Sequence, residues 1–177
     1  MTILSTERLR LEPIDDHHFD GLQAMNRQPE VMRFITGASE TPEQTRRMID
    51  LVKGRWAHHG FSWWAFIERE TDRLVGAGCI QHLGRDPANP HEIGWRLVPD
   101  KWGRGLALEA AQAMAGWAFE ALEAPLLVAV CLPENANSAR VMQKLGMRYR
   151  GEETWYERPH ATWEITRQAW QERPATP

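Results

Sequence analysis

A loop with two glycines at residues 99–109 joins a predicted strand to a predicted helix, and it constrains the fold more than any other stretch. The apolar run 93–98 precedes the loop, and an Ala-rich helical pattern follows it. Gly103 and Gly105 allow a tight turn and a close approach of the backbone to another group. A loop that runs into a helix start leaves several N–H groups unpaired at the positive end of the helix dipole. The stretch therefore predicts an α/β chain with an anion site, for which phosphate is the usual ligand.

Two common phosphate-binding loops do not fit these residues. A P-loop needs Lys followed by Ser or Thr after its second glycine, and neither glycine is followed by such a pair. The dinucleotide fingerprint fails because Leu108 stands at the position of its third glycine. Magnesium-bound nucleoside triphosphates and dinucleotides are therefore excluded as ligands of this loop.

The loop resembles the acyl-CoA loop of the GNAT superfamily of N-acetyltransferases, which has the pattern R/Q-x-x-G-x-G/A. The six matching residues are Trp102, Gly103, Arg104, Gly105, Leu106 and Ala107. Trp102 stands in place of the first Arg or Gln, so the backbone amides remain as the phosphate ligands. With Glu109 and Ala110 after it, the loop is most similar to the branch of ribosomal-protein N-terminal acetyltransferases, which modify alanine or serine. The resemblance implies acetyl-CoA as the ligand, with an added contact from Arg104.

A second motif at residues 135–147 follows an apolar strand at 126–132 and strengthens the resemblance. It is similar to the family pattern N-x-x-S-x-x-x-x-x-K-x-G-F and supplies Asn135, Ser138, Lys144 and Gly146, with Met147 in place of the aromatic residue. Two separated motifs in the right order are much harder to obtain by chance than one. The resemblance runs from residue 6 to about residue 170.

The predicted fold class is α/β, with a single GNAT-like domain at 1–172 and a flexible tail at 173–177. We expect a mixed, mostly antiparallel sheet of six to seven strands, flanked by about four helices. The alternation and turn signals place strands at 6–14, 61–70, 73–83, 92–98, 126–132, 147–155 and 162–170. The first long helices follow Asp15-Asp16 and Thr41-Pro42, because these pairs supply cap residues.

The composition argues against nucleic acids and membranes as partners. A net charge of -3 and the absence of a basic run argue against a nucleic-acid binder. No apolar stretch reaches about 18 residues and no signal-peptide pattern begins the chain, so we expect a cytoplasmic protein without a membrane partner. Cys79 and Cys131 are expected to be buried thiols.

A metal site is not expected. The seven histidines include the pairs His17-His18 and His58-His59, but no two at i, i+4 on one helix face. We interpret these histidines as surface or loop residues.

Acetyl transfer to an amine needs a proton acceptor, because an alkylammonium with a pKa of about 10.4 is almost fully protonated at neutral pH. Glu92, at the start of the strand before the loop, is the candidate base, and a solvated strand-end carboxylate is the alternative. The resemblance further implies that an amide near Leu97 polarises the thioester carbonyl and that Asn135 contacts the pantetheine arm. Many family members donate to the sulfur from a tyrosine where this chain has Met142, so the resemblance suggests Ser138 instead. A helix-start serine without a catalytic role is the alternative.

Nine tryptophans are unusual for 177 residues. Trp63 and Trp95 fall on strands that should border the acceptor pocket, so one hypothesis is an aromatic site for a cationic or aromatic amine. The alternative is that they fill the core and its rim.

The sequence thus predicts an acetyl-CoA-dependent N-acetyltransferase, an acyltransferase that acts by direct attack in a ternary complex without a metal. The acceptor is a primary amine, either a protein N-terminus or a small molecule, and a homodimer is left open. The alternative is a non-catalytic acyl-CoA-binding sensor or regulatory domain, which the missing tyrosine and Trp102 make worth testing.

Overall fold

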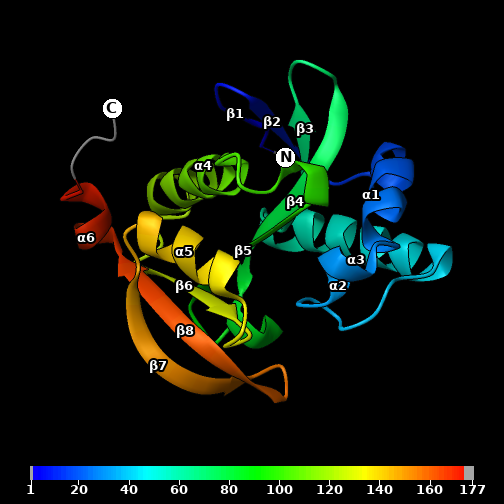
Figure 1. The fold of residues 1–177 in the computed structure, drawn as a ribbon. Helices are drawn as coiled ribbons and strands as arrows, with labels where there is room; N and C mark the ends of the chain where they lie inside the picture. The colour runs from blue at the N-terminus through cyan, green and yellow to red at the C-terminus, as the bar shows by residue number, and fades with distance from the viewer. Residues whose placement is uncertain (1, 174–177) are drawn as a thin grey trace.

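One mixed sheet of eight strands organises residues 2–173, the part of the chain that the computed structural model describes (Figure 1). The strands are β1 (Leu4–Ser5), β2 (Leu9–Pro13), β3 (Trp63–Glu68), β4 (Arg73–His82), β5 (His91–Leu97), β6 (Leu126–Cys131), β7 (Arg148–Trp155) and β8 (Arg158–Thr166). Their order is β1-β2-β3-β4-β5-β6-β8-β7, and β5 and β6 run parallel while the other neighbours run antiparallel.

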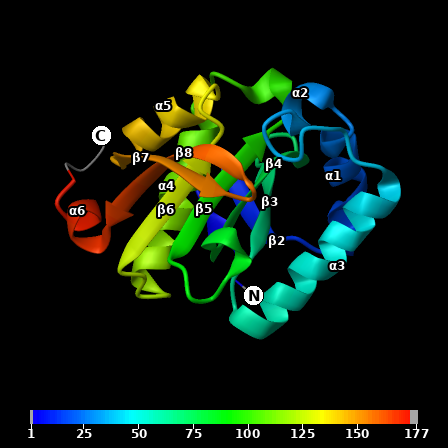
Figure 2. The same cartoon turned by 90° about the horizontal axis from the view of Figure 1, so that it is seen from below.

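Residues 2–173 also form six α-helices and three short 3-10 helices, and all but the last of them lie between strands. They are η1 (Asp16–His18), α1 (Phe19–Asn26), α2 (Pro29–Met32), α3 (Pro42–His59), η2 (Leu83–Arg85), η3 (Pro99–Lys101), α4 (Leu106–Glu120), α5 (Ala136–Lys144) and α6 (Arg167–Gln171). Figures 1 and 2 show α1, α2 and α3 on one side of the molecule and α5 and α6 on the other. The predicted fold class is confirmed. The extra elements are β1, α2 and α6, which are too short to give a periodic signal.

The start of α3 follows the cap predicted from the sequence. The Thr41 side chain accepts a hydrogen bond from the Gln44 amide at 3.3 Å, and the Gln44 side chain accepts one from the Thr41 amide at 2.7 Å. Pro42 fills the first turn, where no donor is needed, and Gly60 ends the helix with a φ of 77°. This reciprocal pair is the capping box that fixes where the helix begins.

The last strand was predicted too late in the chain. The prediction placed it at 162–170, whereas β8 spans Arg158–Thr166 and α6 takes the residues that follow. The cause is the two-residue turn between β7 and β8. Tyr156 and Glu157 both adopt positive φ there, at 51° and 61°, in place of the Asn-Gly type of sequence that marks such turns.

Of the predicted tail, residues 174–177 lie outside the described residues. Arg173 is described, and it donates from Nη1 to the Leu145 carbonyl at 2.9 Å. Its guanidinium also lies over the Trp170 ring, 3.1 Å from the centroid.

Strands β5 and β6 pair over a very short length, and this opens the sheet. Only His91 with Leu127 and Glu92 with Val128 are in register between them. Beyond Glu92, β5 stays paired with β4 as far as Leu97, while β6 separates from it. The edge of β5 that faces β6 is therefore unpaired from residue 93 onward.

Candidate active site

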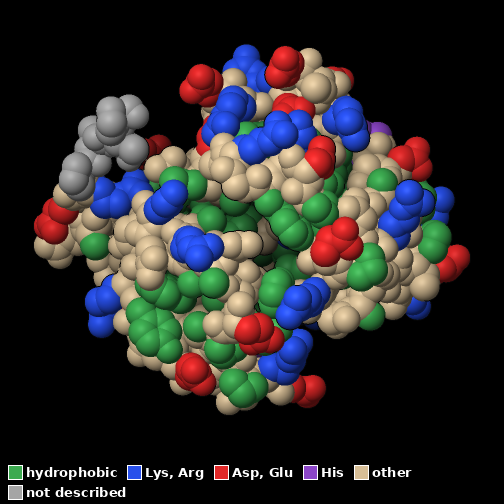
Figure 3. All heavy atoms as spheres, viewed as in Figure 1, with side chains coloured by type: hydrophobic (Ala, Val, Ile, Leu, Met, Phe, Trp, Pro, Cys, Tyr) green, Lys and Arg blue, Asp and Glu red, His purple; other side chains and the backbone are tan. Residues whose placement is uncertain are grey.

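A cleft of about 730 Å³ lies where β5 and β6 separate. Figure 3 shows the surface hollowed between the α4–α5 half and the α2 half, with hydrophobic side chains on the walls. One end, the loop end, is lined by residues 101–103 and 105–108 and by the start of α5. The other end, the Glu92 end, is lined by Trp63, Gln81, Glu92, Arg96 and Tyr156.

The loop end presents free backbone donors. Gly103 and Gly105 adopt φ values of 73° and 80°, a conformation that glycine tolerates and other residues rarely adopt. Within residues 2–173, the amides of 103–108 have no backbone acceptor, and the first helical bond beyond them runs from the Glu109 amide to the Gly105 carbonyl. A β-carbon at Gly103 would meet no heavy atom within 4 Å, so the loop has space beside it. These amides stand at the N-terminus of the 15-residue helix α4, where an anion is favoured.

Contacts from elsewhere in the chain hold this loop in place. Arg8 donates from Nη1 to the Arg104 carbonyl at 2.8 Å and from Nε to the Glu109 carboxylate at 2.6 Å. Glu109 also accepts from Thr6 at 2.6 Å. Lys101 pairs with Glu68 at 2.6 Å. The loop is thereby tied to the first strands and to β3.

Trp102, the residue that departs from the family pattern, points its indole N–H at the Leu97 carbonyl, 2.8 Å away. The Val98 amide donates to the Val75 carbonyl of β4, so by strand alternation the Leu97 peptide groups face away from β4, toward the gap. The Leu97 carbonyl is satisfied by Trp102. The Leu97 N–H has no acceptor among residues 2–173 and lines the cleft.

Glu92 is buried, and two donors hold it. Its Oε2 accepts hydrogen bonds from the Tyr156 hydroxyl and from the Gln81 side-chain amide, the latter at 2.8 Å. Gln81 is itself oriented, because its Oε1 accepts from the Trp63 indole at 3.3 Å. Within the described residues Oε1 of Glu92 has no partner, so this oxygen is free for a ligand. Burial raises the pKa of Glu92 above its ordinary 4.5, while the two hydrogen bonds lower it by less.

Tyr156 is a site residue that the sequence did not predict. It lies at the tip of the β7–β8 hairpin, 64 residues from Glu92, and also accepts a hydrogen bond from the Gly84 amide at 3.2 Å. Burial and the Glu92 charge raise the pKa of its hydroxyl well above the ordinary value of 10. No local motif marks this residue, because the turn that carries it lacks glycine.

Asn135 and Ser138 line the loop end of the cleft. Asn135 caps α5: its Oδ1 accepts from the Ser138 amide at 3.2 Å, which leaves the amide nitrogen of its side chain for a ligand. The Ser138 hydroxyl makes no hydrogen bond to another described residue. Both alternatives considered for this helix start are therefore compatible with the geometry.

Trp63 and Trp95 both line the cleft and also pack against the core. One face of the Trp63 ring is occupied, because the Arg96 guanidinium lies 4.8 Å from its centroid. The sequence did not predict a role for Arg96, which is only 8% exposed.

The two cysteines are buried, as predicted, and both line the cleft. Burial raises the pKa of Cys131 to about 11, and it also raises the pKa of Cys79 well above its ordinary value. Both thiols are therefore protonated at neutral pH and are poor nucleophiles.

The family model of an acetyltransferase (GNAT) domain matches residues 8–148. The chain belongs to the GNAT acetyltransferase family. It is 30% identical over 149 residues to the uncharacterized N-acetyltransferase YnaD of Bacillus subtilis, covering 84% of each chain. A GNAT-family acetyltransferase from Bacillus anthracis is 25% identical with a TM-score of 0.80, over 94% of this chain and 99% of that one. A ribosomal alpha-N-protein acetyltransferase in complex with coenzyme A shares the fold at 15% identity, with a TM-score of 0.79 over 93% and 98% of the two chains.

Membership in the GNAT family implies acetyl transfer from acetyl-CoA. The residues at the loop end fit that substrate, because free amides, left-handed glycines and open space occur together there. No helix among the described residues has the length and apolar character needed to span a bilayer.

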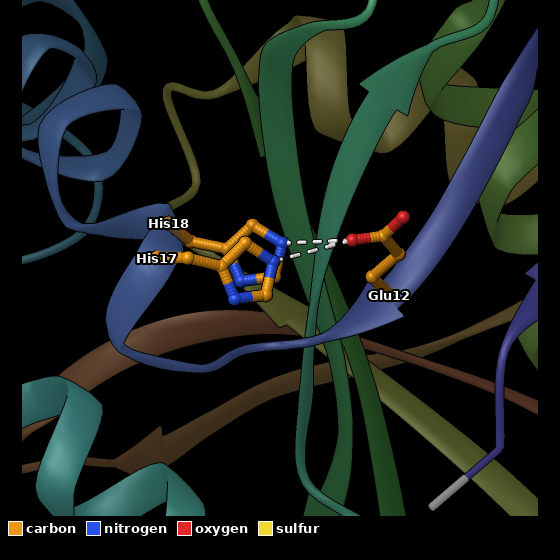
Figure 4. Close-up of side chains that lie close together, drawn as sticks. All are labelled: Glu12, His17 and His18. Atoms are coloured by element: carbon orange, nitrogen blue, oxygen red, sulfur yellow. Dashed lines mark hydrogen bonds and ion pairs between the residues drawn. The ribbon is translucent and has the colours of Figure 1, made fainter.

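One side-chain group could be considered for a metal. Nε2 of His18 and Nε2 of His17 lie 3.1 and 3.5 Å from Oε2 of Glu12 (Figure 4). Nδ1 of His18 accepts from the Asp15 amide at 3.0 Å, so the proton of this neutral ring is on Nε2, the atom that a metal would need unprotonated. The prediction that the histidines are surface or loop residues was wrong for His18 and His160. His18 is 4% exposed, because its ring completes the cap of η1, and His160 is 9% exposed within β8. His58 and His59 are exposed as predicted.

Proposed function

We propose that this protein transfers the acetyl group of acetyl-CoA to a primary amine by direct attack in a ternary complex. The observation that carries the proposal is a buried carboxylate in the same cleft as the loop amides, where one carboxylate oxygen and the amides of residues 103 and 105–108 have no partner among residues 2–173. A base and an anion site on one continuous cleft suit a reaction that joins an ammonium and a phosphate-bearing donor.

Glu92 is proposed as the general base. An acceptor amine arrives as an ammonium with a pKa of about 10.4, and Oε1 of Glu92 takes its proton, directly or through a water. The raised pKa of Glu92 brings it nearer the operating pH, which favours this role. The amine nitrogen then bonds to the thioester carbon, the carbon–sulfur bond breaks, and the proton that nitrogen loses goes to the departing thiolate.

The donor side of the site is proposed from the loop end. The amides of Gly103 to Ala107 would hold the pyrophosphate, with Trp102 setting the loop rather than touching phosphate. The Leu97 N–H would donate to the thioester oxygen, where negative charge develops. Asn135 would bind the pantetheine arm, and the Ser138 hydroxyl would donate to the sulfur.

The acceptor is proposed to be either a protein N-terminus or a small-molecule amine. The first is supported by the fold shared with a ribosomal alpha-N-protein acetyltransferase. A thiol-release assay with acetyl-CoA and a panel of peptides and small amines tests both. Acceptor-dependent release of coenzyme A is the expected result.

A non-catalytic acyl-CoA sensor is the second candidate, favoured by Met142 in place of the family's tyrosine. Calorimetric binding of acetyl-CoA without release of thiol by any amine would support the sensor. Absence of binding would contradict both functions.

A further inference from the structure

A buried guanidinium lies at the Glu92 end of the cleft, and no described residue forms an ion pair with it. Arg96 is 8% exposed, and its Nε has no hydrogen-bond partner. Within residues 2–173, no acceptor takes a hydrogen bond from its guanidinium, and no carboxylate lies within ion-pair distance. Burying an unpaired charge is costly, so a position that keeps one calls for a partner.

The surroundings of Arg96 do not supply that partner. Its contact with the Trp63 ring positions the guanidinium but supplies no hydrogen-bond acceptor, and the buried Nε has no partner among the described residues. Glu40 is the carboxylate whose charge acts on Arg96, yet its Oε2 accepts from Asn26 at 2.8 Å and from Thr45 at 3.4 Å. Burial lowers the pKa of Arg96, because the nearby negative charges do not offset the cost of removing its positive charge from water.

Arg96 also shares a sheet face with the proposed base. Residues 92, 94 and 96 of β5 point to the same side, and the middle one is glycine. A β-carbon at Gly94 would meet only the Cys79 sulfur, at 3.4 Å, so no side chain separates Glu92 from Arg96 along the strand. Their Cα atoms are about 13 Å apart at the rise of an extended strand, and both side chains are long.

Building on the acetyl transfer proposed above, we infer that the acceptor is a small amine that also carries a carboxylate. The amine lies at Oε1 of Glu92, and the carboxylate accepts hydrogen bonds from the Arg96 guanidinium. A guanidinium edge presents two parallel N–H groups that match the two oxygens of a carboxylate. An acceptor of this class brings a positive group to the buried anion and a negative group to the buried cation. A purely cationic amine would leave Arg96 unpaired and would meet a resident cation at Trp63.

The test compares acids with their amides. Glycine, β-alanine, 4-aminobutanoate, 6-aminohexanoate and glycylglycine are each assayed beside the matching carboxamide at saturating acetyl-CoA. Loss of a charge-assisted pair should lower kcat/KM by about 10- to 100-fold, so the acid of the best-fitting length should exceed its amide by that factor. In Arg96→Met the ratio of kcat/KM for the acid to kcat/KM for its amide should fall to about one.

Three controls accompany this comparison. Arg47→Met removes an exposed arginine of α3 and should keep the preference for acids. Arg96→Lys keeps the charge without the planar fork and should retain part of the preference. Arg96→Met should also raise Tm, since it removes an unpaired buried charge, whereas a merely structural arginine would lower Tm when replaced.

Equal rates for acids and amides in the wild type, or a preference for acids that persists in Arg96→Met, would overturn the inference. Transfer to none of these amines, nor to any amine or peptide of the wider panel, would instead refute the proposed acetyl transfer, and the inference with it.

Discussion

Replacing Tyr156 by Phe should move the pH dependence of catalysis rather than abolish catalysis. The Tyr156 hydroxyl donates to Oε2 of Glu92 and so holds the pKa of that carboxyl below the value that burial alone would give. A hydrogen bond to a charged group contributes about 1.5–3 kcal/mol, and one pH unit corresponds to about 1.36 kcal/mol. Gln81 still donates to the same oxygen in the variant, so we expect the lower end, an upward shift of about 1 pH unit.

The measurement is the pH profile of kcat/KM for the wild type and Tyr156→Phe. The acid limb should move up by about 1 unit, and the plateau at high pH should stay within a few-fold of the wild type. Tyr149→Phe is the matched control, because Tyr149 is 47% exposed and its hydroxyl bonds no described residue. An acid limb that stays in place, or activity lost equally at every pH, would refute the role given to Tyr156.

Tyr156→Phe should also change how the free energy of unfolding depends on pH. The pKa of Glu92 is raised in the folded state above its ordinary 4.5, so its contribution to the free energy of unfolding is fully present below 4.5. That contribution is lost as pH rises through the folded pKa. Because Tyr156→Phe raises the folded pKa further, the decline should extend to higher pH in urea titrations of the variant.

Three further substitutions test separate parts of the structure. Glu92→Gln should lower kcat by about 10²- to 10⁴-fold without lowering Tm at pH 8, since it replaces a buried carboxylate by a neutral isostere. Gly105→Ala places a β-carbon at a φ of 80°, so calorimetry should show weaker acetyl-CoA binding and a stability loss of about 1–2 kcal/mol, whereas Gly54→Ala, in the exposed middle of α3, should be neutral or stabilising. Thr41→Ala should cost about 1 kcal/mol by chemical denaturation and leave the KM for acetyl-CoA unchanged, because Thr41 does not line the cleft.

The parts of the fold that sequence could predict have local causes. Thr41 and Gln44 cap α3 through each other, and both lie within one helical turn. The conformation of the glycine loop is also predictable, because Gly103 and Gly105 tolerate positive φ whatever their tertiary surroundings. Signals of this kind can be found without knowledge of the tertiary structure.

The Glu92 end of the cleft has no such local cause. Tyr156 meets Glu92 only because the tip of the β7–β8 hairpin lies beside the start of β5, and the two residues are 64 positions apart, so no local pattern marks the contact. Arg96 was missed for a different reason. The alternation of β5 puts Glu92 and Arg96 on its polar face, which a period-two pattern assigns to solvent, whereas both are buried because that face lines the cleft.

The replacement of the family's Arg or Gln by Trp102 bears on the thioester as well as on the phosphates. In an extended strand, the N–H and C=O of one residue point to the same side, so the Leu97 N–H comes with its own carbonyl beside it. An unpaired carbonyl oxygen there would repel the negative charge that develops on the thioester oxygen. The Trp102 indole N–H binds that carbonyl at 2.8 Å and reduces this repulsion. Trp102 thus links the phosphate loop to the Leu97 peptide, whose N–H is proposed to polarise the thioester. One loop conformation therefore positions both the phosphate-binding amides and the Leu97 N–H.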